Sequence, residues 1–145
     1  MAQKRFVAPL RPLFAARGLF LQVVLRYGTH MRKTIYKIVP EAMWTASGSE
    51  GVFRGAPIDH ADGFIHFSTA GQVAETAARH FSGQDDLLLV AVDEAALGPA
   101  LKYEVSRGGA LFPHLYGALP HGAVRWIRPL PLGQDGHHVF PELDA

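Results

Sequence analysis

The chain has 145 residues, of which 48% are apolar and 19% are charged, and it contains no cysteine. This composition is typical of one soluble globular domain and excludes wholesale disorder. Without cysteine, neither a disulfide framework nor a thiolate zinc site can form. The lack of cysteine suits a reducing compartment, and we expect a cytoplasmic protein.

The first thirty residues differ in character from the rest of the chain. They carry five basic residues and no acidic one, whereas the remainder holds nine basic and thirteen acidic residues. The apolar run at residues 19–25 is too short to cross a bilayer. Three explanations stay open: an extension without function, an amphipathic surface segment and a targeting signal. We predict a poorly ordered basic extension at residues 1–30 and one globular domain at residues 31–145.

The remainder of the chain alternates between β-branched runs, capping residues and turn signals, which predicts a single α+β domain with short helices. Strands are predicted at residues 34–39, 52–54, 86–93, 101–106 and 123–130. The run at 86–93 is apolar on both sides and should be covered on both faces. Helical segments are predicted at residues 41–46, 69–81 and 94–97. Turn chemistry is predicted at residues 57–63 and a long loop at residues 107–117.

The central stretch of the chain, residues 62–69, combines a short strand with the start of a helix. Strand alternation predicts that Phe64, His66 and Ser68 share one face. Thr69 is a suitable helix N-cap, and Gln72 three residues later completes a Thr-x-x-Gln capping box. An imidazole and a hydroxyl are therefore expected side by side near a helix N-terminus. A half-buried His66 with satisfied ring nitrogens is the structural alternative.

Two further segments carry candidate functional groups. Alternation in residues 101–106 places Glu104 on one face together with Lys102. In the predicted loop, His114 and Tyr116 lie two residues apart and would point the same way if the chain is extended there. Glu104 could also pair with Lys102 or with Arg107 on a solvated face.

Several familiar sites are excluded by the spacing of the residues. The eight histidines show no His-x-x-x-His or His-Glu-x-x-His pattern, so no metal is expected, although His60, His66 and His114 could in principle meet. Neither a Gly-x-Ser-x-Gly elbow nor a Walker or Gly-x-Gly-x-x-Gly loop is present. The body of the chain is mildly acidic without a basic stripe, which argues against nucleic acid as the partner but would not repel a small ligand held by a few local cations. We expect a small-molecule ligand and no membrane partner.

These residues form a recognisable pattern over residues 35–140, which resembles the bacterial family known as domain of unknown function 952. The matching segments are Ile35-Tyr36-Lys37-Ile38, Trp44, Asp62-Gly63-Phe64-Ile65-His66-Phe67-Ser68-Thr69 with Gln72, Glu104, Arg107-Gly108-Gly109 and Phe112-Pro113-His114-Leu115-Tyr116-Gly117. The extension before Met31 lies outside this resemblance.

That family is similar in fold to ADP-ribosyltransferases, in which two small split sheets hold NAD between them. The resemblance implies that His66, Glu104 and His114 are catalytic. It also implies ligand-binding roles for Lys37, Ser68, Thr69, Arg107 and Tyr116, with NAD as substrate or ligand. Lys37 stands where a histidine or arginine is usual in ADP-ribosyltransferases.

Three functional hypotheses stay open from the sequence. The first is an enzyme that cleaves NAD or transfers ADP-ribose, in which Glu104 stabilises the positive charge that develops on the ribose. The second is a binding module that holds a nucleotide-like ligand without turnover. The third is a hydrolase or transferase that uses His66 and His114 as acid and base. The sequence does not give the oligomeric state.

Overall fold

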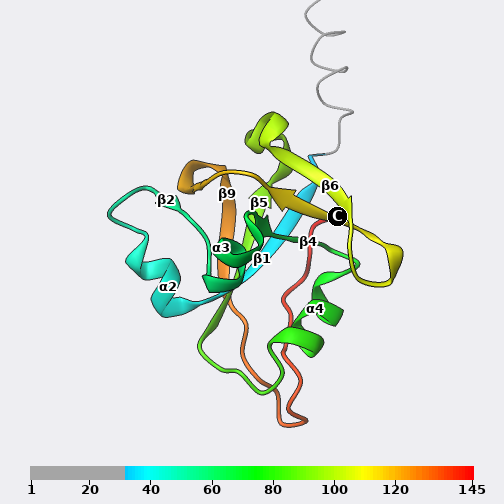
Figure 1. Cartoon of the computed structure of the whole chain (residues 1–145). Helices are drawn as coiled ribbons and strands as arrows, with labels where there is room; N and C mark the ends of the chain where they lie inside the picture. Colours follow the sequence, from blue (N-terminus) through cyan, green and yellow to red (C-terminus); the bar gives the residue numbers. More distant parts are fainter. Residues whose placement is uncertain (1–31) are drawn as a thin grey trace, which may run out of the picture. The chain divides into compact units, whose positions relative to one another are not determined.

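The computed structural model describes residues 32–145, and the predicted extension at residues 1–30 lies outside the described residues (Figure 1). Its largest sheet has four antiparallel strands in the order β4-β1-β5-β9. These strands are β4 (Ser68–Thr69), β1 (Thr34–Pro40), β5 (Leu87–Asp93) and β9 (Val124–Pro129). The strands predicted at 34–39, 86–93 and 123–130 are therefore confirmed.

Two smaller antiparallel sheets accompany the four-stranded sheet. One has the order β3-β7-β6, and the other pairs β2 with β8. Their strands are β3 (Ile65–His66), β7 (Leu111–Leu115), β6 (Leu101–Val105), β2 (Val52–Phe53) and β8 (Leu119–Pro120). The helical segments are α2 (Glu41–Ala46), α3 (Pro57–Asp62), α4 (Val73–His80) and the 3₁₀ turns η1 (Glu94–Ala100), η2 (Arg107–Gly109) and η3 (His121–Ala123). Several antiparallel sheets with short helices confirm the predicted α+β class.

Both faces of the four-stranded sheet are covered by apolar groups, because β1 and β5 are apolar at nearly every position. Alternate residues such as Ile35 and Val90 pack towards the three-stranded sheet, where they meet Ile65 and Leu115. The intervening residues pack on the opposite face against α4, Phe140 and Leu143. The prediction that residues 86–93 form a doubly covered strand is confirmed. Within residues 32–145, no helix has the length and apolar character needed to cross a membrane.

The central stretch divides between two sheets, which corrects the prediction that His66 and Ser68 share a strand face. His66 belongs to β3 and pairs with β7, whereas Ser68 belongs to β4 and pairs with Tyr36 of β1. The buried Phe67 lies between them. Ser68 points to α4, where its hydroxyl lies 2.9 Å from that of Thr76. Ser68 therefore does not share a strand face with the His66 imidazole, contrary to the prediction from strand alternation.

Three predicted element boundaries are wrong for local reasons. The α4 helix begins at Val73 rather than Thr69, although the Thr69 N–H does donate to Oε1 of Gln72 at 3.1 Å. Residues 57–62 of the predicted turn form α3, because Pro57 suits the first helical position. The predicted loop at 107–117 is mostly the strand β7, and Gly108 and Gly109, with φ of 69° and 79°, turn β6 back into it.

Candidate functional site

The three-stranded sheet presents one polar face, because its register aligns polar residues on all three strands. His114 of β7 lies opposite His66 of β3 and also opposite Lys102 of β6. Glu104, two residues beyond Lys102, lies opposite Phe112. Directly opposed residues and their neighbours two positions away project from the same face of a sheet. The face opposite the main core therefore gathers histidines, a carboxylate and a lysine.

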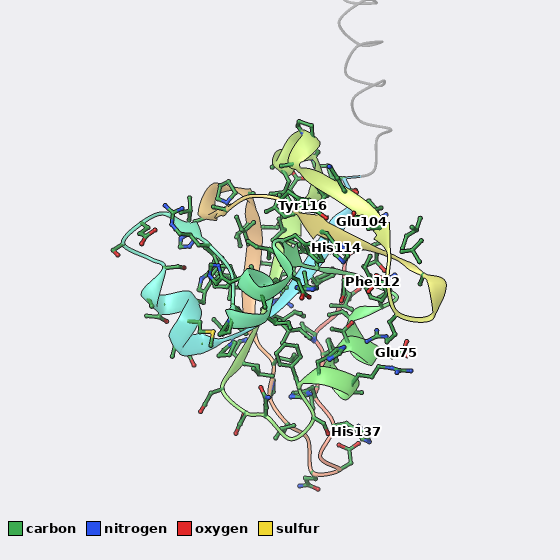
Figure 2. The ribbon with its side chains drawn as sticks, in the orientation of Figure 1. Glu75, Glu104, Phe112, His114, Tyr116 and His137 are labelled. Atoms are coloured by element: carbon green, nitrogen blue, oxygen red, sulfur yellow. The ribbon has the colours of Figure 1, made fainter. Side chains whose placement is uncertain are left out.

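Glu104 is the centre of a small hydrogen-bond network on this face. Its Oε1 accepts from Tyr116 Oη at 2.6 Å and contacts Nδ1 of His114 at 3.0 Å (Figure 2). The bonds from Tyr116 and His114 lower the pKa of Glu104, so the carboxylate stays ionised at neutral pH. The hydrogen bond to Glu104 also raises the pKa of the Tyr116 hydroxyl. Glu104 therefore acts as an acceptor that orients both aromatic side chains.

The contact with Glu104 defines the tautomer of His114. An ionised carboxylate only accepts hydrogen bonds, so Nδ1 of His114 carries the proton. Among residues 32–145, Nε2 of His114 has no hydrogen-bond partner, although the side chain is almost fully buried. A ring with one nitrogen held by a carboxylate and the other unpaired has the arrangement of a general base oriented by a carboxylate.

Aromatic rings surround His114 on the same face. The ring of Phe64 stacks on His114, with 4.0 Å between the centroids and 19° between the planes. The rings of Tyr116 and His66 lie 5.4 and 4.7 Å from Phe64. His114 retains only 6% side-chain exposure, whereas Tyr116 is 42% exposed. The stack restricts rotation of the His114 ring, and the Lys102 ammonium lies 5.0 Å from the centroid of the partly exposed Tyr116 ring.

His66 lies beside His114, with 5.5 Å between the two ring centroids, but its nitrogens are both engaged. Nδ1 lies 2.7 Å from Oδ1 of Asp59, and Nε2 lies 2.9 Å from Oδ2 of Asp62. His66 is thus enclosed between two carboxylates, and neither ring nitrogen is free to contact a ligand.

Asp59 holds this arrangement in place from inside the protein. It is the third residue of α3, where one oxygen accepts from the N–H of Ala56 at 2.7 Å, and the other accepts from the N–H of His66 at 3.0 Å. The Lys37 ammonium lies 2.9 Å from the Asp59 carboxylate, and both side chains are almost fully buried. A Cβ on Gly55 would lie 2.9 Å from Cβ of Asp59, so only glycine allows this close approach.

The buried charges have opposing effects on the protonation of Asp59. Burial raises its pKa, but the hydrogen bond from His66, the Lys37 charge and the backbone N–H groups outweigh burial and hold the pKa well below its usual range. Burial lowers the pKa of Lys37, and Asp59 opposes that shift. The carboxylate form of Asp59 is therefore strongly preferred in the folded protein.

This preference predicts how stability depends on pH. A depressed pKa contributes stability that is fully present above the unfolded value, which is 3.8 for Asp59, and that is lost as the pH falls further. We expect the free energy of unfolding to fall steeply below about pH 4. The difference in free energy of unfolding between the unaltered protein and Asp59→Asn should become smaller over the same pH range. Urea unfolding at several pH values measures this, and a difference that stays constant would contradict the prediction.

Comparisons with known proteins decide the family. The sequence matches the model of the family described as "Protein of unknown function (DUF952)" over residues 38–127. The chain belongs to this family. The crystal structure of protein CC0527 from Caulobacter crescentus is similar to this chain, with 48% identity, a TM-score of 0.71, and coverage of 73% of this chain and 93% of that chain. Its solution NMR structure gives 49% identity, a TM-score of 0.66, and coverage of 72% and 90%. No curated protein matches the chain.

The match to the DUF952 model includes the residues that build the polar face. His66, Glu104, His114 and Tyr116 all lie within residues 38–127, as does Asp59. The resemblance to this family inferred from the sequence is confirmed.

The structure brings together four of the eight predicted site residues. His66, Glu104, His114 and Tyr116 converge on one face of the three-stranded sheet, as the network of contacts above shows. The other four lie elsewhere: Lys37 is buried against Asp59, Ser68 points to α4, Thr69 belongs to β4, and Arg107 contacts His80 at the β6–β7 turn. Lys37 and Ser68 are therefore placed to support the fold rather than to contact a ligand.

Three residues of the site were not predicted from the sequence. Asp59 could have been found, because a proline at the first position and an aspartate at the third are a helix-start signal. Asp62 and Phe64 lie in the central stretch, but their contacts to His66 and His114 depend on how β3 pairs with β7.

Metal-ligand geometry was the remaining question for these histidines and carboxylates. In the part of the chain that the structure describes, no three histidine or acidic side chains are grouped so as to hold a metal ion. A hollow of about 210 Å³ lies elsewhere, between α4 and the C-terminal segment, and its lining includes Ala77 and His138. The polar face is thus distinct from this hollow.

Proposed function

We propose that the polar face of the three-stranded sheet binds a small molecule and that His114 is its general acid–base catalyst, oriented by Glu104. The observation that carries this proposal is the 3.0 Å contact from Nδ1 of His114 to Glu104, which leaves Nε2 without a hydrogen-bond partner among the described residues. A positioned base of this kind accelerates proton transfer by about 10²–10⁴-fold.

The contacts favour His114 over His66 as the proton-transferring group. His66 is held at both nitrogens by Asp59 and Asp62, so neither nitrogen is free to accept a substrate proton. The centroid of its ring lies 5.5 Å from that of His114, close enough for both rings to contact one ligand. We assign proton transfer to His114 and a ligand-positioning role to His66.

NAD or a related nucleotide is the ligand class that we propose for this face. Glu104 is 39% exposed and ionised, so one carboxylate oxygen is available for a ribose hydroxyl or for the positive charge that develops when the nicotinamide bond breaks. The exposed ring of Tyr116 offers a surface on which a base could stack. Such a site would resemble that of an ADP-ribosyltransferase. It would differ in having no cationic residue of the first strand at the ligand, because Lys37 is buried against Asp59.

The test combines binding and turnover with one set of variants. The protein is incubated with NAD, released nicotinamide is quantified, and thermal unfolding is followed with NAD and ADP-ribose. We expect stabilisation by the nucleotides and nicotinamide release that Glu104→Gln abolishes. Glu75→Gln is the matched control, because Glu75 is an exposed residue of α4 away from this face (Figure 2). Stabilisation without release would indicate a non-catalytic binding module and contradict the acid–base role. No stabilisation by either nucleotide would reject this ligand class.

A further inference from the structure

We propose that Arg107 and His80 form a recognition site for a phosphate group of the ligand that reacts at His114. Arg107 lies in η2 at the turn between β6 and β7, and His80 is the last residue of α4. The inference rests on the proposed function, because it places the phosphate on the same molecule. It names the residues that would bind a phosphate of the proposed ligand.

The guanidinium of Arg107 is incompletely satisfied. Its Nη2 is one of two fully buried side-chain polar atoms without a hydrogen-bond partner among residues 32–145. A guanidinium is always charged and only donates, so each unpaired N–H lacks an acceptor. Buried donors are nearly always paired in folded proteins, and an unpaired one needs an explanation such as an absent ion. A phosphate oxygen is an acceptor of the required charge.

The partner that Arg107 does have leaves its charge uncompensated. Nη1 lies 3.1 Å from Nε2 of His80, and because arginine must donate, His80 accepts through Nε2 and carries its proton on Nδ1. Arg54 and Arg79, in contrast, each pair with a glutamate four residues before them, at 2.8 and 2.9 Å. No carboxylate neutralises Arg107 within the described residues. The site therefore presents a positive charge together with a second donor from the imidazole.

An anion at Arg107 requires the residues around it to move, because Nη2 is fully buried. His80 is exposed and, in the part of the chain that the structure describes, its ring hydrogen-bonds to Arg107 alone, so its side chain can rotate without losing another hydrogen bond. Gly108 and Gly109 are also exposed, and a Cβ at either position would meet no atom within 4 Å. The planar fork of arginine then binds two oxygens of one phosphate.

Phe112 connects the anion site to the acid–base pair. The Arg107 guanidinium lies 5.2 Å from the centroid of the Phe112 ring, and Phe112 lies opposite Glu104 in the sheet (Figure 2). His114 follows two residues later on the same face, about 7 Å further along the strand. A phosphate at Arg107 would thus lie on the order of 10 Å from His114. A nucleotide or a sugar phosphate spans such a distance, whereas a free phosphate does not reach both groups.

The experiment measures binding of inorganic pyrophosphate to the full chain by calorimetric titration. We expect Arg107→Gln to raise Kd about tenfold or more, because a charge-assisted pair of hydrogen bonds is lost. Arg107→Lys should lose part of the affinity, since lysine keeps the charge without the fork. Arg128→Gln is the matched control: Arg128 also stacks on an aromatic ring, at 4.8 Å from Trp126, and should leave Kd within about twofold.

A further variant separates this proposal from the proposed function. Glu104→Gln removes the acid–base network but should not weaken pyrophosphate binding. Binding that depends on Arg107 supports the anion site even if no nicotinamide is released, in which case only the catalytic role fails. Equal affinities of Arg107→Gln and Arg128→Gln, or no binding of pyrophosphate at millimolar concentration, would overturn the anion site.

Discussion

Replacement of Asp59 by alanine is expected to lower the free energy of unfolding by about 3–5 kcal/mol, the usual cost of removing one partner of a buried ion pair. Asp59 has only 2% exposure, and its carboxylate accepts from Lys37, His66 and Ala56. Without it, the Lys37 ammonium stays buried with no counter-charge, and two backbone N–H groups lose their acceptor. Urea unfolding followed by tryptophan fluorescence measures this loss.

Two comparisons identify the ion pair as the cause of that loss. Glu50→Ala removes an ion pair with Arg54 whose side chains are 55% and 67% exposed, and it should cost less than about 1 kcal/mol. Adding Lys37→Met to Asp59→Ala removes the unpaired charge and should restore part of the stability, because an apolar side chain suits that buried position. A loss in Asp59→Ala no larger than that in Glu50→Ala would contradict the role assigned to this network.

Replacement of His114 by asparagine is expected to reduce nicotinamide release by about 10²–10⁴-fold, the usual contribution of a general acid–base group. Asparagine keeps a donor that can reach Glu104, but it cannot exchange a proton near neutral pH. The fold should persist, since His114 lies on the polar face rather than in the main core. The rate of release from NAD, compared with the melting temperature of each variant, measures the effect separately from stability.

His137→Asn provides the matched control for this substitution. His137 is exposed and lies well away from the Glu104 network in Figure 2, so its loss should leave the rate unchanged. ¹⁵N NMR of the histidine side chains adds an independent measurement, because the protein should show His114 protonated at Nδ1, and Glu104→Gln should alter that signal. An Nε2-protonated His114 in the unaltered protein would exclude the proposed orientation by Glu104.

The sequence was informative about the strands that carry His114 and Glu104. Alternation in residues 101–106 correctly indicated a strand, and the two-residue spacing of His114 and Tyr116 correctly indicated that both side chains point the same way, since both contact Glu104. The loop assignment failed because glycines, a proline and a tyrosine resemble loop composition. Tertiary pairing with β3 and β6 nevertheless makes residues 111–115 a central strand.

The roles of Lys37 and Ser68 could not be predicted from local patterns. Lys37 occupies a core-facing position of β1, and only a carboxylate 22 residues away makes its burial tolerable. Ser68 lies two residues from His66, a spacing that predicts one shared face in a continuous strand. The chain instead leaves one sheet for another at Phe67, and no periodicity within eight residues indicates which strand each half will pair with.

By itself, the sequence determined the α+β class, the main strands and the family, because apolar alternation and residue identity are properties of the chain that need no partner. Tertiary structure alone decided which polar groups meet: Lys37 with Asp59, Asp59 with His66, and Glu104 with His114. Those pairings depend on strand order and register, which arise from burying both faces of the four-stranded sheet at once. Hydrogen bonds between residues so far apart in the chain follow from that global packing rather than from any local signal.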